Sequence, residues 1–287
     1  MKKLVLCECG SGKFKEECCP TSIRAWAQPI AGPEDRKKIL EMLLIGSEFE
    51  MRNRGLMHYY GKDFIDYKRE RPKDQRRNYF LMVISKYMTD YLEDDFPPSW
   101  QECDQYFWEE FLLAQYPYHL QISREQNELE KFSKELKKFT SWLDSRYQTR
   151  HTDIVKELID THFDELKTCE STLNVLFEHT FPNILDRKAN LQADMLENLS
   201  SLDQFDETTF TLLKVINING PIVHATDMVT NQSIQIIDVP MKAILPGVIL
   251  GGTIGKTKGS WLWTWHSPSV VFPSKAEKHL ENVLFYC

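Results

Sequence analysis

Apolar residues recur at alternating steps of three and four along the middle of the chain, from about residue 33 to residue 200. This period is that of an amphipathic α-helix. It is clearest after Ser123, where the apolar positions are Leu129, Phe132, Leu136, Phe139 and Leu143. Ser123 and Gln126 have the spacing of a capping box, which predicts that this helix begins directly after Ser123.

Other segments of the same zone share the helical pattern. Pro33 followed by Glu34 and Asp35 predicts a helix start, because proline fits the first turn and acidic side chains favour the positive end of the helix dipole. Further helices are expected from about residue 78, over 100–114, over 153–178 and over 184–199. The pattern therefore predicts an all-helical domain over residues 33–200.

The period changes after residue 208, where short β-branched and aromatic runs alternate with turn residues. Strands are expected at 210–218, 222–226, 233–239, 248–254 and 261–265. About five short strands at this spacing are typical of a small barrel of the OB or SH3-like kind. We therefore expect a multidomain α+β protein in which residues 208–287 form a small β-barrel with a short C-terminal helix.

Composition and charge limit the classes of partner. Hydrophobic residues make up 42% of the chain and charged residues 27%, which is typical of a soluble globular protein. The formal net charge of −7 argues against generic, charge-driven binding to nucleic acid or to an anionic membrane. No apolar run reaches the roughly 18–20 residues that span a bilayer, and the run 4–6 is far shorter than the roughly 7–15 residues of an export signal. These features predict a cytoplasmic protein with no membrane partner.

Four of the seven cysteines lie within residues 7–19, in the pattern Cys-x-Cys-Gly-Ser-Gly-Lys-Phe-Lys-x-x-Cys-Cys. Four thiolates complete a tetrahedral zinc site and leave no open position for a substrate. Gly10 and Gly12 allow a tight turn between the two cysteine pairs. The pattern therefore predicts a zinc knuckle over residues 1–22, with metal-free thiols as the alternative, and its ligands are Cys7, Cys9, Cys18 and Cys19.

This run resembles the SEC-C motif, the zinc knuckle at the tail of the SecA translocation ATPase, which also occurs in many otherwise unrelated bacterial proteins. The resemblance covers residues 5–20 and includes the Gly-Ser-Gly-Lys run between the cysteine pairs. Cys19 takes the last ligand position, which is His or Cys in that family. The resemblance implies bound zinc, with iron as the alternative metal. It also implies a docking module, since the SecA knuckle contacts the chaperone SecB and the ribosome.

The knuckle favours a non-catalytic cytoplasmic adaptor as the function. In this hypothesis the knuckle docks on a protein partner, SecB-like or ribosomal, and a barrel or helical face carries a second interaction. Lys13, Phe14 and Lys15 would present the contact surface of the knuckle. A knuckle that only anchors the N-terminus, without a partner, is the alternative.

Three tryptophans support a second hypothesis, binding of single-stranded nucleic acid. Trp261, Trp263 and Trp265 alternate, so a strand would place all three rings on one face. An exposed face would be a stacking platform, with Lys256 and Lys258 meeting phosphates. An internal face would instead fill the barrel or pack on the helical domain, which is the commoner placement.

The remaining candidate residues give weaker indications of function. Cys103 and Cys169 lack a local signature of a nucleophile and are expected to be buried core residues. The basic run 68–77 is expected to be a solvated linker, with contact to ribosomal RNA or an acidic partner as the alternative. An enzyme with a site between the helical and barrel domains is the third hypothesis, and the sequence does not identify its residues.

Overall fold

The computed structural model describes residues 32–186, 188–241 and 244–280. The α-helices in these ranges are α2 (Pro33–Ser47), α3 (Tyr59–Glu70), α4 (Gln75–Lys86), α5 (Gln105–Glu110), α6 (Tyr116–Tyr118), α7 (Glu128–Tyr147), α8 (His151–Thr180) and α9 (Leu191–Ser200). Two π-helical segments, Tyr87–Tyr91 and Phe111–Gln115, directly follow α4 and α5. Short 3-10 turns cover Asn53–Met57, Trp100–Glu102, Ser201–Gln204 and Ser274–His279. Among the described residues, no helix has the length and apolar character needed to cross a membrane.

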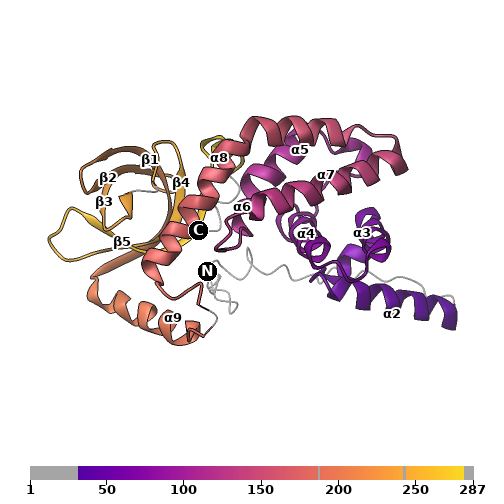
Figure 1. The fold of residues 1–287 in the computed structure, drawn as a ribbon, viewed down its shortest axis with the longest axis horizontal. Coiled ribbons are helices and arrows are strands. Elements are labelled where there is room, and N and C mark those ends of the chain that lie inside the picture. Colours follow the sequence, from indigo (N-terminus) through magenta and orange to yellow (C-terminus); the bar gives the residue numbers. More distant parts are fainter. Residues whose placement is uncertain (1–31, 187, 242–243, 281–287) are drawn as a thin grey trace, which may run out of the picture.

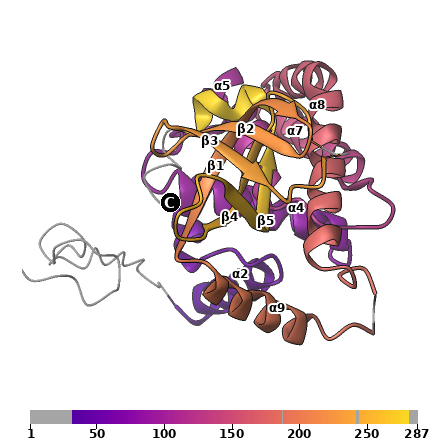
Figure 2. The same ribbon diagram turned by 90° about the vertical axis from the view of Figure 1, so that its left-hand side faces the viewer.

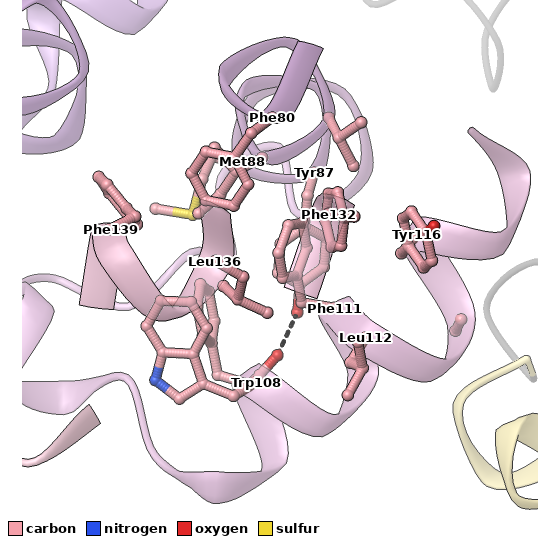
Figure 3. Packing of buried hydrophobic residues seen from close by; sticks show 14 of the residues in the cluster. Phe80, Tyr87, Met88, Trp108, Phe111, Leu112, Tyr116, Phe132, Leu136 and Phe139 are labelled. Atoms are coloured by element: carbon pink, nitrogen blue, oxygen red, sulfur yellow. Dashed lines mark hydrogen bonds between the residues drawn. The ribbon is translucent and has the colours of Figure 1, made fainter. Parts of the chain in front are cut away.

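Most helices gather on one side of the molecule and the strands on the other; α9 lies on the side of the strands, and α8 runs from the helical part to the sheet (Figure 1). Aromatic rings from α4, α5 and α7 fill the core of the helical part (Figure 3). The ring centroid of Phe80 lies 5.6 Å from that of Phe132 and 5.2 Å from that of Phe139. Full burial of such a side chain contributes about 1.5–3 kcal/mol. The periodic apolar positions predicted for the longest helices therefore do form the core.

The helix expected after Ser123 exists, but it begins at Glu128. The backbone of Gln126 is left-handed, with a φ of 45°, and this ends any helical continuity from Ser123. The Ser123 hydroxyl does accept from the Gln126 N–H at 3.2 Å, as a capping box requires, but within a turn that precedes the helix. The first turn of α7 is instead capped by Glu170 of α8, whose Oε1 accepts from the Glu128 N–H at 2.7 Å.

Two other boundaries differ from the predicted ones because side-chain caps interrupt the pattern. The segment expected as one helix over 100–114 is a 3-10 turn followed by α5, whose first turn is capped by the Asp104 carboxylate accepting from Phe107 N–H at 2.9 Å. The helix expected over 184–199 begins only at Leu191, where the Asn190 side chain caps the Ala193 N–H at 3.2 Å. The helix expected over 153–178 is confirmed as the core of α8.

Five strands follow α9: β1 (Glu207–Asn219), β2 (Ile222–Asp227), β3 (Ser233–Ile237), β4 (Ile249–Lys256) and β5 (Trp263–Phe272). Antiparallel pairs join β1 to β2, β2 to β3, β1 to β4 and β4 to β5. A parallel pair joins β3 to β5 through only two residue pairs, so the order β1-β2-β3-β5-β4 returns to β1 (Figure 2). The expected combination of helices with a small β-sheet is therefore confirmed, and the sheet is mixed.

The sheet separates two buried apolar clusters, and strand residues belong to both. Leu213 and Leu250 point into the cluster enclosed by the strands, together with Leu173 of α8. Their neighbours Leu212 and Ile249 belong to the cluster that fills the helical part. Successive side chains of a strand point to opposite faces, so both faces of β1 and β4 are covered here. A continuous apolar core thus crosses the boundary expected between the helical and β domains.

Candidate functional site

The predicted metal ligands and contact residues of the knuckle, Cys7, Cys9, Cys18, Cys19, Lys13, Phe14 and Lys15, lie outside the described residues. Within the described ranges, no three His, Cys, Asp or Glu side chains are grouped as metal ligands. Cys103 and Cys169 are free and buried, as expected from the sequence. Burial raises the pKa of the Cys103 thiol to about 12 and also raises the pKa of Cys169, so both remain thiols at neutral pH.

The three alternating tryptophans do not form a shared exposed face. Strand β5 begins only at Trp263, so Trp261 precedes it in the turn and is 68% exposed. Trp265 is 4% exposed, and its ring lies so close to Gly252 of β4 that a Cβ there would stand 2.7 Å away. Trp263 is half-buried against the apolar cluster within the strands. Their surroundings thus correspond to the internal alternative, with Trp261 as the exception.

The two lysines beside these rings have different environments. Lys256, the last residue of β4, places its ammonium 4.5 Å from the ring centroid of Trp263 and 3.0 Å from a Glu207 carboxylate oxygen. Lys258 is exposed in the β4–β5 turn, where its backbone N–H donates to Asp206 at 2.6 Å. The charge of Lys256 is thus already paired within the protein.

A polar pocket of about 510 Å³ opens beside the two π-helical segments. Its lining residues are Lys86, Asp90, Tyr91, Glu93, Gln115, Tyr118 and His119. Single π-helical turns inside α-helices are frequent at functional sites. Pro117 accounts for the second segment, because it has no N–H for the carbonyl of Leu113 and its ring crowds that carbonyl. The widened turn places Gln115 at the pocket.

Two charged residues that line the pocket, Lys86 and Asp90, are already in ion pairs. The Lys86 ammonium lies 2.8 Å from a Glu50 carboxylate oxygen, and this hydrogen bond and charge lower the pKa of Glu50. Asp90 is paired with the Arg52 guanidinium at 2.8 Å. Burial lowers the pKa of His119 to about 4, with the nearby Lys86 charge acting in the same direction. At neutral pH, His119 therefore presents a neutral imidazole to the pocket.

Gln115 gives the pocket its clearest sign of an unfilled binding role. Its side chain is 6% exposed, and within the described part of the chain its Nε2 has no hydrogen-bond partner. A buried amide without a partner costs about 1–3 kcal/mol. A ligand oxygen that accepted from this Nε2 would remove the cost.

The pocket lies close to the sheet. The Tyr118 ring packs edge-on against Phe272 of β5, with centroids 4.9 Å apart. The Tyr91 hydroxyl oxygen lies 3.3 Å from the carbonyl oxygen of His279, in the 3-10 turn after β5. The unpartnered Gln115 amide, as a donor, and the neutral His119 imidazole suit binding of a small polar molecule. The sequence pattern did not identify this site, since the one local signal was a proline inside an apparently helical run.

Comparisons of the chain with protein-family models, with curated proteins and with solved structures find no match in any of the three.

Proposed function

We propose that the protein is a metal-binding adaptor whose N-terminal knuckle docks on a protein partner. The observation that carries the proposal is the spacing of Cys7, Cys9, Cys18 and Cys19 around a Gly-Ser-Gly-Lys run. Four thiolates around zinc form a closed site, which stabilises a small fold instead of supplying a catalytic metal. The resemblance to the SEC-C motif supports a SecB-like chaperone or the ribosome as the partner, in the cytoplasm.

A binding assay with purified components tests this proposal. The full chain is titrated against a SecB-type chaperone and, separately, sedimented with 70S ribosomes. Lys13→Ala/Lys15→Ala is expected to weaken capture at least about tenfold while zinc stays bound, because the lysines border the ligands without being ligands. Lys37→Ala/Lys38→Ala, on the exposed face of α2, is the matched control and should bind as wild type. Equal binding by both double variants, or no capture of either partner, contradicts the proposal.

The strand order supports the OB type of barrel over the SH3-like type. β1 pairs with both β2 and β4, and the chain returns so that β3 and β5 are parallel. An SH3-like barrel is mainly an antiparallel meander, whereas the OB type is a five-stranded, partly open Greek key. This assignment supports single-strand binding through Trp261 and Lys258 by fold analogy alone.

A second candidate function, binding of a small polar ligand in the polar pocket, is favoured by the unpartnered amide of Gln115. The test is a thermal-shift screen of free amino acids and small carboxylates with the full chain. A ligand that stabilises the wild type should not stabilise Gln115→Leu, because the leucine cannot donate to it. Gln121→Leu, at an exposed position outside this pocket, is the control and should keep the shift. A shift that persists in Gln115→Leu refutes binding through this amide.

A further inference from the structure

A second groove, independent of the knuckle and of the polar pocket, runs between α7 and α8. The two helices are joined by only three residues, 148–150, and lie antiparallel and in contact (Figure 1). The lining residues span 130–141 on α7 and 152–163 on α8, and the groove has a volume of about 800 Å³. Eleven helical steps correspond to about 17 Å. The groove is thus long and open, which suits an extended ligand.

The groove is positively charged although the whole chain is acidic. Four lysines line it against two carboxylates, and these residues are Lys134, Lys137, Lys138, Lys156, Glu130 and Asp160. Lys138 is paired with Glu135 at 2.8 Å, and Lys137 lies 3.9 Å from Asp160. In the described ranges, no ion pair involves Lys134 or Lys156, and both side chains are exposed. Two ammonium groups are therefore left for an anionic ligand.

One buried hydroxyl group in the same groove lacks a hydrogen-bond partner. Ser133 is 5% exposed and lines the groove, yet its Oγ makes no hydrogen bond to any described residue. The Thr152 hydroxyl, on the facing helix, is also buried, but it contacts the Asp144 carboxylate. Buried hydroxyls are ordinarily hydrogen-bonded. A hydroxyl donor without a partner, beside unpaired lysines, is the kind of group that contacts phosphate oxygens.

We propose that the α7–α8 groove binds the sugar–phosphate backbone of single-stranded nucleic acid. Lys134 and Lys156 pair with successive phosphates, and the Ser133 hydroxyl donates to a phosphate oxygen. Partly buried Phe163, beside buried Ile159, provides an apolar floor for sugars and bases. The elongated shape favours a chain of phosphates over a single compact phosphate group. The inference does not depend on the adaptor proposal, since it uses no residue of the knuckle.

Fluorescence anisotropy with labelled 12-mers of uridine and of deoxythymidine tests this, using the full chain between 50 and 300 mM KCl. Each lysine–phosphate contact contributes about −0.7 to the slope of log affinity against log salt for single strands, so Lys134 and Lys156 together predict a slope of about −1.4. Lys134→Glu/Lys156→Glu should weaken binding at least about tenfold at 50 mM KCl and reduce the slope by about 1.4. Ser133→Ala should weaken binding about threefold without lowering the unfolding midpoint, because its hydroxyl has no partner to lose.

Two matched variants make the same charge change elsewhere. Lys37→Glu/Lys38→Glu on α2 and Lys256→Glu/Lys258→Glu at the sheet should both bind within about twofold of wild type. Lys134→Met/Lys156→Met repeats the test if the glutamate variant fails to fold. Tripolyphosphate is tested as a ligand beside the two 12-mers. The proposal is overturned if neither 12-mer binds at 50 mM KCl or if only tripolyphosphate binds. It is also overturned if either control variant loses as much affinity as the groove variant.

Discussion

The buried ion pair between Arg77 of α4 and Glu135 of α7 gives the sharpest prediction about stability. Both side chains are almost fully buried, and the Arg77 Nε lies 3.3 Å from Glu135 Oε1. The Tyr67 hydroxyl donates to the same carboxylate at 2.9 Å, and the Arg77 guanidinium stacks 3.7 Å from the Tyr67 ring centroid. We expect Glu135→Gln to keep the Tyr67 hydrogen bond and to leave the buried Arg77 charge without its main partner.

The magnitude follows from distance and burial. At 3.3 Å and an effective dielectric constant of about 20, the Coulomb energy of the pair is about 5 kcal/mol. Removing one partner of a buried pair costs about 3–5 kcal/mol of unfolding free energy. Lys138, the other cation on Glu135, is 39% exposed, so Lys138→Met should cost at most about 1 kcal/mol. This contrast separates a buried pair from an exposed one that shares the same carboxylate.

Urea unfolding at pH 7 measures both effects, with circular dichroism to confirm that each variant folds. A double-mutant cycle adds Arg77→Met and the double variant Arg77→Met/Glu135→Gln. The double variant should be at least about 2 kcal/mol more stable than the sum of the single losses predicts, because it no longer holds a buried charge whose main partner is missing. A loss below about 1 kcal/mol for Glu135→Gln, or an additive cycle, refutes the reasoning.

Two further predictions concern a buried acid and a close backbone contact. Burial raises the pKa of Glu110, which accepts from the hydroxyls of Tyr87 at 2.6 Å and Tyr91 at 3.3 Å. The native state therefore holds this proton more tightly than the unfolded state. Protonated Glu110 therefore contributes its full stabilisation below pH 4.5, the ordinary pKa of the group. This stabilisation is lost as pH rises through the raised pKa of Glu110 in the native state. Glu110→Gln should thus be more stable than wild type at pH 7, and this difference in stability should disappear below pH 4.5. A difference between the urea midpoints that stays the same below pH 4.5 contradicts this prediction. At Gly255, a Cβ would stand 2.3 Å from the Phe205 ring, so Gly255→Ala should cost about 1–3 kcal/mol in urea unfolding. The cost should fall below about 0.5 kcal/mol in a Phe205→Ala background, and an unchanged cost there shows that overpacking is not the cause.

Local pattern was enough to place α7, α8 and the strands β1 to β4, but it did not predict α3, and β5 covers Trp263–Phe272 where a strand was expected at 261–265. The apolar positions Leu129, Phe132 and Leu136 of α7 are all buried. The start of that helix was missed because Glu170, 42 residues away, caps it through tertiary contact. No neighbouring residue signals such a cap, so the Ser123–Gln126 spacing predicts a start that is too early.

Charge and alternation were harder to interpret than periodicity. The run 68–77 reads as solvated, yet Lys68 and Arg77 are both buried, because carboxylates from other segments pair with them. The alternating tryptophans are separated by the start of β5, which leaves Trp261 outside the strand. The polar pocket depends on two π-helical turns that bring Asp90 and Gln115 to one place, and sequence spacing does not show this.

Metal content tests the central claim, the metal-binding knuckle, most directly. The full chain is purified without a metal-affinity tag or chelator, and zinc and iron are measured by elemental analysis beside Cys18→Ser/Cys19→Ser. Cys103→Ser, at a buried free thiol, is the control for loss of a cysteine. We expect about one metal ion per chain in the wild type and in Cys103→Ser, and almost none in the double variant. A wild-type chain without stoichiometric metal, or a double variant that keeps it, contradicts the account.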